Sequence, residues 1–275
     1  MSDDPNRAGP ATASPSAAEG LSQEELDALV AAADTGGRTP SGPVGLFILL
    51  VALAWSLFQL WIASPLPFML GFGVFNDTEA RSFHLAFALF LAFAAYPAAK
   101  SGFQTGLAVG VPVVLCALFI YGSREGDPVW WIPLVGAAMI LAVLLGSPRN
   151  RVPVWEWALA IIGAAAALYV FVFYDEIGRR VGAPILQDFV VSVIGLLVLL
   201  EATRRALGPA LMIVASVFLV YTFLGPMMPS IIAHKGNSLA EVVNHQWITT
   251  QGVFGIALGV STSFVFLFVL FGSLL

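Results

Sequence analysis

Charge is scarce in this chain of 275 residues: 11% of its residues are charged and 59% are hydrophobic. About a quarter of the residues of a soluble domain are charged, so this composition excludes soluble globular and disordered proteins. The mean hydropathy of +0.89 agrees with that exclusion. Basic residues number only 12 against 17 acidic ones, which leaves no basic surface for phosphates and excludes a nucleic-acid partner.

Residues for metal and catalytic sites are also few. The one cysteine, Cys116, excludes an internal disulfide and a cysteine-based metal site. The three histidines, His84, His234 and His245, lie far apart without the spacing of metal ligands. No Ser/His/Asp set, phosphate-binding loop or HExxH motif is present. We therefore expect neither an enzyme nor a bound cofactor in this chain.

Long apolar runs dominate what the sequence does contain. A helix needs about 20 apolar residues to cross the hydrocarbon core, and backbone amides find no water in lipid, so a continuous run must be helical. The sequence therefore predicts an all-α fold, a polytopic bundle of about eight transmembrane helices in a lipid bilayer. The eight runs are 44–63, 82–99, 103–121, 129–146, 154–174, 185–203, 208–232 and 252–275.

The first 43 residues have a different composition. Residues 1–43 hold seven acidic and two basic residues among Pro, Ser, Ala and Gly, which predicts a mostly disordered tail. Ser22 and Glu25 have the spacing of a capping box, which favours a short amphipathic helix at 23–33. The loops on the side of this tail carry concentrated basic residues, whereas those on the other side are interleaved with acidic ones. This favours a cytoplasmic N-terminus.

Three charged residues lie inside the apolar runs, and all three lie within four residues of a run end: Glu156, Asp188 and Glu201. A carboxylate in the middle of the membrane costs about 3 kcal/mol or more and usually marks a transport path. We therefore expect this chain to contain no proton relay and no buried ion-pair pathway of its own. Glu156 and Asp188 fall in the first turns of their helices, where a negative charge is favourable.

Glu201 is followed by Arg204 and Arg205 at i+3 and i+4, so the three side chains share one helix face. One interpretation is a local ion pair at a helix end, since Gly208 and Pro209 follow. The other is a polar anchor for a neighbouring helix or a cytoplasmic gate. The sequence leaves both interpretations open.

Small residues recur every four positions in two of the runs, a spacing that lets helices pack closely. The glycines concerned are Gly102, Gly106, Gly110, Gly255 and Gly259. The hydroxyl residues at 261–263 could in principle be sodium ligands, but such side chains more often bond back to their own helix. We expect the second arrangement.

Several stretches resemble the fused permeases of TRAP transporters (tripartite ATP-independent periplasmic), specifically the TAXI branch. The most specific strings are EATRR at 201–205 and GVFGIALGVSTSFVFLFVLFG at 252–272. Two features depart from the family pattern: Gln251 stands where Glu is expected, and 101–146 has the character of an inserted helical hairpin. The similar stretches are 25–38, 54–68, 76–97, 185–229 and 247–275.

The resemblance implies a multi-pass protein of the cell inner membrane with a division of labour. Residues 44–205 resemble the small membrane domain, with about six helices, and 206–275 resemble the first two helices of the large domain, which is apparently truncated. The resemblance implies a sodium-coupled permease importing organic anions, with sodium ions and substrate bound beyond Leu275. Its partners would be an extracytoplasmic substrate-binding protein and the remainder of the large permease domain. The alternative is a membrane assembly protein that does not transport.

Overall fold

The computed structural model describes residues 37–38, 40–98, 102–180 and 182–275. The chain divides into two units, 1–37 and 38–275, and all the helices of the described residues belong to the second. The amphipathic helix predicted at 23–33 lies outside the described residues. Within the described residues the secondary structure is helical, without strands, in agreement with the predicted all-α class.

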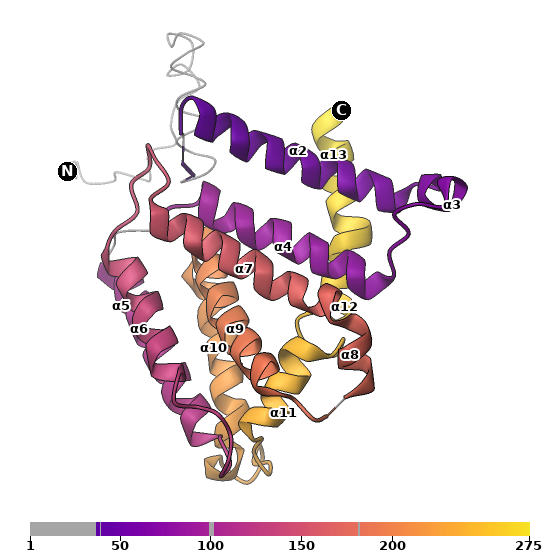
Figure 1. Ribbon diagram of the computed structural model, residues 1–275. Helices are drawn as coiled ribbons and strands as arrows, with labels where there is room; N and C mark the ends of the chain where they lie inside the picture. Colours follow the sequence, from indigo (N-terminus) through magenta and orange to yellow (C-terminus); the bar gives the residue numbers. More distant parts are fainter. Residues whose placement is uncertain (1–36, 39, 99–101, 181) are drawn as a thin grey trace, which may run out of the picture. The chain divides into compact units, whose positions relative to one another are not determined.

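Seven helices of 13 or more residues form most of the described fold (Figure 1). They are α2 (Pro43–Ala63), α4 (Asp77–Ala95), α5 (Gly102–Tyr121), α6 (Ile132–Leu144), α7 (Val154–Val172), α9 (Leu186–Ala206) and α10 (Pro209–Leu224). A further helix near the C-terminus is continuous but changes its pitch, running as α12 (Ile256–Val260), the π-helical η4 (Ser261–Val265) and α13 (Phe266–Leu274). The short elements are α3 (Leu66–Leu70), α8 (Tyr174–Arg179), η2 (Gly225–Met227), α11 (Leu239–Val243) and the π-helical η3 (Asn244–Ile248).

Six helical stretches in the described part of the chain are long and apolar enough to cross a membrane. By the length and composition of its helices, the chain is compatible with a multi-pass membrane protein. The stretches are Pro43–Ala63, Gly102–Tyr121, Val154–Val172, Leu186–Ala206, Pro209–Met227 and Ile256–Ser273.

Eight membrane-crossing helices were predicted and six helical stretches are long and apolar enough. The other two predicted runs explain this difference. The run at 129–146 forms α6, which has only 13 residues. The run at 82–99 forms α4, which has 19 residues but begins at Asp77 and carries Glu79 and Arg81 in its first turns. Its start is fixed by a capping box, because Asn76 accepts from the backbone N–H of Glu79 while the Glu79 carboxylate accepts from that of Asn76.

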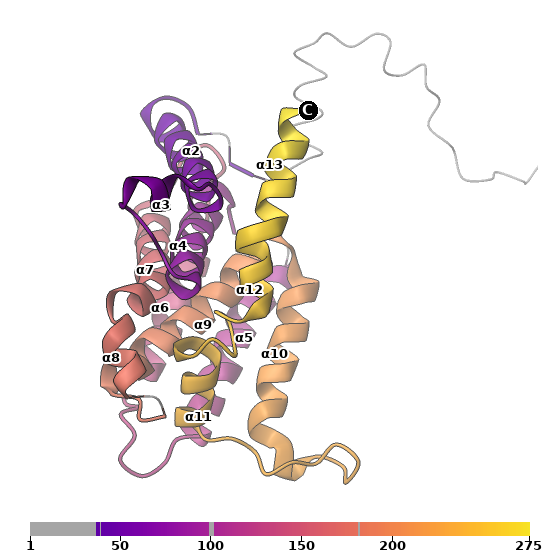
Figure 2. The ribbon, with the colours of Figure 1, turned by 90° about the vertical axis from the view of Figure 1, so that its right-hand side faces the viewer.

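Helix α9 lies at the centre of the bundle. Within its apolar window 61% of residues are buried, against 6% for α2 and for the stretch Ile256–Ser273. Gly163 of α7 permits close packing of three helices, since an added Cβ would lie 3.0 Å from Val198 of α9 and 3.2 Å from Leu89 of α4. The α12–α13 helix, by contrast, stands at the edge and runs past α4 and α2 (Figure 2).

The segment between α10 and α12 enters the bundle, where the sequence had indicated only a connecting loop. Trp247 of η3 is completely buried, and its Nε1 donates to the carbonyl of Ala166 in α7 at 3.1 Å. An added Cβ on Gly195 of α9 would collide with the Trp247 ring. The short elements α11 and η3 therefore pack on α9 inside the bundle.

Candidate functional site

A buried charge cluster joins the C-terminal end of α9 to the N-terminal end of α7. Arg205 donates from Nη1 to Glu156 Oε2 across the two helices, and from Nε to Glu201 Oε1 at 2.6 Å. Arg204 forms a two-point contact with the same carboxylate, with both nitrogen–oxygen distances at 2.8 Å. The cluster consists of Arg38, Glu156, Glu201, Arg204 and Arg205, all of them buried.

Arg38, which precedes α2, extends the cluster to two further helix ends. Its Nη2 lies 3.5 Å from Glu156 Oε1, and its Nη1 donates to the carbonyl of Ala94 near the end of α4 at 3.0 Å. Beyond α6, it bonds to Ser147 Oγ at 2.5 Å and to the carbonyl of Pro148 at 3.2 Å. Burial lowers the pKa of Arg38, and the attraction of Glu156 opposes that shift.

The local ion pairs predicted for Glu201 are present in this cluster, and the gate interpretation stays a prediction. The i+3 and i+4 ion pairs form as the spacing indicated, and Arg205 also anchors α9 to α7. For Glu156 we predicted only a favourable position in the first turn of a helix. The sequence did not indicate that Arg38 and Arg205 contact its carboxylate. Three guanidinium groups surround two carboxylates, and Arg205 also lies 4.7 Å from the centre of the Phe93 ring.

Asp188 combines the predicted role at a helix start with a paired charge. Its carboxylate accepts from the backbone N–H of Ile185 at 2.9 Å, which caps α9. Arg180 contacts both carboxylate oxygens, at 3.1 and 2.9 Å, and the Tyr169 hydroxyl donates to it at 2.8 Å. The hydrogen bond to Asp188 raises the pKa of Arg180, which lies outside the membrane-crossing helices.

The two glycine stripes have different surroundings within the described residues. An added Cβ on Gly102, Gly106 or Gly110 would meet nothing within 4 Å, so no helix among the described residues lies against that face of α5. At Gly255 the added atom would meet backbone carbonyls of the preceding turn. At Gly259 it would lie 2.7 Å from Nη2 of Arg81, so this glycine makes room for a guanidinium group.

The hydroxyl residues of η4 largely bond back to their own helix, as expected. Thr262 donates to the carbonyl of Leu258 at 2.7 Å, and Ser263 to that of Gly259 at 2.8 Å. Ser261 differs, because its Oγ lies 3.2 Å from Nε2 of His84 on α4. The π-helical turn therefore directs one hydroxyl toward a different helix.

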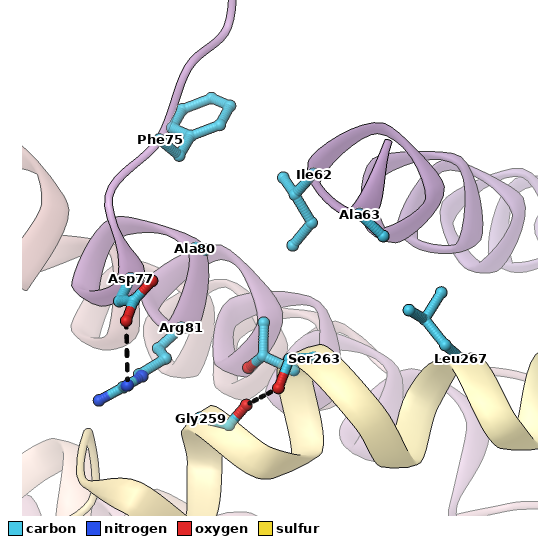
Figure 3. Close-up of a pocket in the computed structure, with 10 residues that line it drawn as sticks. Ile62, Ala63, Phe75, Asp77, Ala80, Arg81, Gly259, Ser263 and Leu267 are labelled. Atoms are coloured by element: carbon cyan, nitrogen blue, oxygen red, sulfur yellow. Dashed lines mark hydrogen bonds and ion pairs between the residues drawn. The ribbon is translucent and has the colours of Figure 1, made fainter. Parts of the chain in front are cut away.

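A pocket of about 370 Å³ lies where the end of α2, the start of α4 and the α12–η4 helix meet (Figure 3). We call it the Arg81 pocket. Arg81 donates from Nη1 to the carbonyl of Phe254 at 3.0 Å, and its Nη2 lies 3.7 Å from Asp77 Oδ2. The lining residues are Ile62, Ala63, Phe75, Asp77, Ala80, Arg81, Gly259, Thr262, Ser263 and Leu267.

Next to this pocket, α4 continues as a polar face that sequence reasoning missed. Asp77, Arg81 and His84 follow one another at i, i+4 and i+7, a spacing that places them on one side of a helix. His84 is buried, and its Nδ1 contacts the amide of Gln59 and Nε1 of Trp55 on α2. The spacing of these three residues is visible in the sequence. It was missed because the helix was predicted to begin at residue 82, after Asp77 and Arg81.

Among the described residues, no group of three or more His, Cys, Asp or Glu side chains is placed to hold a metal ion. A scan against protein-family models and searches of curated proteins and of solved structures found no match to this chain.

Proposed function

We propose that this chain is part of a membrane permease and supplies mainly its stationary scaffold. The permease would be a sodium-coupled TRAP transporter of the TAXI branch, importing organic anions delivered by an extracytoplasmic binding protein. The strings at 201–205 and 252–272 support the choice of family through their resemblance to it. The remainder of the large permease domain would hold substrate and sodium.

The buried charge cluster is the observation that carries the scaffold role. Its ion pairs and hydrogen bonds connect the ends of α4, α7 and α9, with the charged side chains removed from solvent. Removing one partner of such a pair costs about 3–5 kcal/mol, because the other charge stays buried without compensation. Sliding of these helices past one another is therefore strongly opposed, as a stationary frame requires.

Sodium entry would supply the work of transport. One charge moving through 100 mV of membrane potential releases about 2.3 kcal/mol. At about 1.4 kcal/mol per tenfold ratio, this supports roughly 50-fold accumulation of substrate. The scaffold contributes by widening the fixed frame against which the other domain moves in an elevator-like cycle.

The test is uptake in proteoliposomes containing this full chain, the remainder of the large permease domain and the binding protein encoded with them. We expect uptake of a radiolabelled organic acid that requires an inward sodium gradient and stops when this chain is omitted. The proposal is overturned if the complete set gives no sodium-dependent uptake. It is also overturned if uptake is undiminished without this chain, which would favour an assembly protein that does not transport.

A further inference from the structure

The Arg81 pocket lies between the two helices of the bundle that are least buried. Both α2 and the stretch Ile256–Ser273 have only 6% of their apolar window buried. Leu57 of α2 and Phe264 and Phe268 of the other helix are more than half exposed. In a membrane such side chains would contact acyl chains wherever no other protein covers them, so the pocket opens between two exposed apolar surfaces.

The polar part of the pocket lies at the end of α2 and the start of α4, where helix ends would meet the lipid headgroups of a bilayer. Arg81 is the fifth residue of α4, about 6 Å from the helix start at 1.5 Å per residue. The connection before α4 exposes large apolar side chains, among them Phe68, Met69 and Phe72. Trp61 holds this connection by donating its Nε1 to the carbonyl of Gly73 at 3.1 Å. Apolar and tryptophan side chains at a helix end are typical of the membrane interface.

The pocket is lined by two charged side chains of opposite sign. The Arg81 side chain is 18% exposed, and that of Asp77 is 93% exposed. Their separation of 3.7 Å is too long for a hydrogen bond, and an ion pair whose carboxylate is this exposed contributes little stability. A guanidinium group has five N–H donors, and the carbonyl of Phe254 accepts from one of its nitrogens. Arg81 therefore retains donors that can bind an oxyanion.

We propose that the Arg81 pocket binds the headgroup of a phospholipid that carries both a phosphate and a primary ammonium group, as in phosphatidylethanolamine. Arg81 binds the phosphate through charge-assisted hydrogen bonds, and the ammonium group donates to the exposed carboxylate of Asp77. The apolar walls at Ile62 and Leu267 contact the first carbons of the acyl chains. This site is independent of the proposed transport function and would be present in either kind of membrane protein.

The arrangement discriminates between headgroups. The quaternary ammonium of phosphatidylcholine has no N–H to donate to Asp77. Phosphatidylglycerol carries no cation, so its phosphate would approach Arg81 against the repulsion of Asp77. The two charges thus favour the primary amine over both alternatives, and the preference depends on Asp77 rather than on Arg81.

The experiment measures lipid retention by native mass spectrometry of the purified full chain. Phosphatidylethanolamine, phosphatidylcholine and phosphatidylglycerol with identical acyl chains are added at equal concentration. We expect phosphatidylethanolamine to be retained most strongly. Arg81→Gln should lower its retention about tenfold, the usual effect of losing one charge-assisted hydrogen bond. Asp77→Asn should instead remove the preference over phosphatidylcholine, a change that a merely structural role would not produce.

Matched variants complete the design. Lys235→Gln and Asp175→Asn change exposed charges away from the pocket and should leave retention unchanged. If Arg81→Gln fails to fold, Ser263→Leu fills the pocket without changing either charge and should also lower retention about tenfold. The proposal is overturned if the wild-type chain retains the three lipids equally, or if Arg81→Gln and Ser263→Leu retain phosphatidylethanolamine as strongly as the wild-type chain. It is also overturned if Asp77→Asn keeps the preference over phosphatidylcholine. Soluble phosphoethanolamine binding as tightly as the lipid would overturn the assignment to a membrane lipid.

Discussion

Arg205 of α9 and Glu156 of α7 form an ion pair between two helices, and neither side chain has any exposed surface. The two residues are 49 positions apart in the chain. Their helices run in opposite directions, so the pair holds the C-terminal end of one against the N-terminal end of the other. Arg38 approaches the same carboxylate from a third segment. One glutamate thus contacts two buried cations, and Glu201 supplies a second carboxylate to Arg205.

Replacing Glu156 should therefore destabilise the protein strongly. Glu156→Ala leaves Arg38 and Arg205 buried without this counter-charge, and we expect a loss of about 3–5 kcal/mol in the free energy of unfolding. Unfolding in detergent with increasing denaturant measures the change. Glu176→Ala is the matched control, because Glu176 lies exposed on α8 and should change stability by less than about 0.5 kcal/mol. Equal stability of the two variants would contradict a structural role for the pair.

The packing of η3 on α9 gives a second prediction, at Gly195. Gly195→Ala places a methyl group in the space of the Trp247 ring, and overpacking of this kind costs about 1–3 kcal/mol. Replacing the ring by a smaller side chain, in the double variant with Trp247→Leu, should recover part of the loss. Gly106→Ala is the control: its added methyl meets nothing, and alanine favours a helix over glycine by about 1 kcal/mol. If Gly195→Ala is as stable as this control, Trp247 does not pack against α9.

Two variants of Asp188 separate the contribution of its charge to stability from that of its hydrogen bonds. Asp188→Ala removes the partner of Arg180 and the acceptor of the Tyr169 hydroxyl, and we expect a loss of about 1–3 kcal/mol in unfolding free energy. Asp188→Asn keeps an oxygen that can cap α9 and should lose less. Asp175→Ala, at an exposed aspartate of α8, is the comparison for both. Thermal unfolding followed by tryptophan fluorescence orders the four proteins.

The positions of the membrane-crossing helices were predictable because hydrophobic continuity is local. The run predicted at 185–203 is α9, Leu186–Ala206, and it ends where Gly208 adopts a φ of +90° before Pro209. Pro112 does not end α5, which continues through it. The length of the run at 129–146 was predicted too long because its apolar ends are not part of the helix. Helix α6 starts at Ile132 and ends at Leu144.

The site was only half predictable, because its partners are distant in sequence. The pairs of Glu201 follow from helical spacing, whereas nothing near Glu156 indicates Arg38 or Arg205. Trp247 was treated as part of a connection, since the segment around it contains too few apolar residues for a membrane crossing. It is buried because the short α11 and η3 pack on α9, which no local pattern encodes.

The capping box at the start of α11 should make this segment sensitive to acid. The backbone N–H of Ser238 donates to Glu241 Oε2 at 2.7 Å, which lowers the pKa of that carboxyl below its ordinary 4.5. Stability from the ionised form is present above the ordinary pKa and is lost as pH falls through the lowered one. The carboxylate side chain is 43% exposed, so solvent screening limits the effect to less than about 1 kcal/mol.

Hydrogen exchange of the α11 amides, corrected for intrinsic rates, measures this loss between pH 6 and pH 3 (roughly the range of carboxyl titration). We expect less protection at the acidic end in the wild-type chain and no such change in Glu241→Gln. Glu125→Gln alters another exposed acidic residue of the neighbouring loop and should keep the wild-type response. An unchanged pH response in Glu241→Gln would show that another group is responsible.

Orientation in the membrane is the last prediction, and labelling of single cysteines decides it. Cys116 is buried, and Cys116→Ala provides a background without thiols. Asn150 and Glu176 lie exposed at opposite ends of α7, and Glu125 lies exposed between α5 and α6. With a cytoplasmic N-terminus, Glu176→Cys reacts with an impermeant maleimide in intact cells, whereas Asn150→Cys reacts only after permeabilisation. The opposite pattern would place the buried charge cluster at the outer surface.

Glu125→Cys tests α6 itself: labelling like Glu176→Cys means that this helix of 13 residues crosses the membrane, and labelling like Asn150→Cys means that it does not.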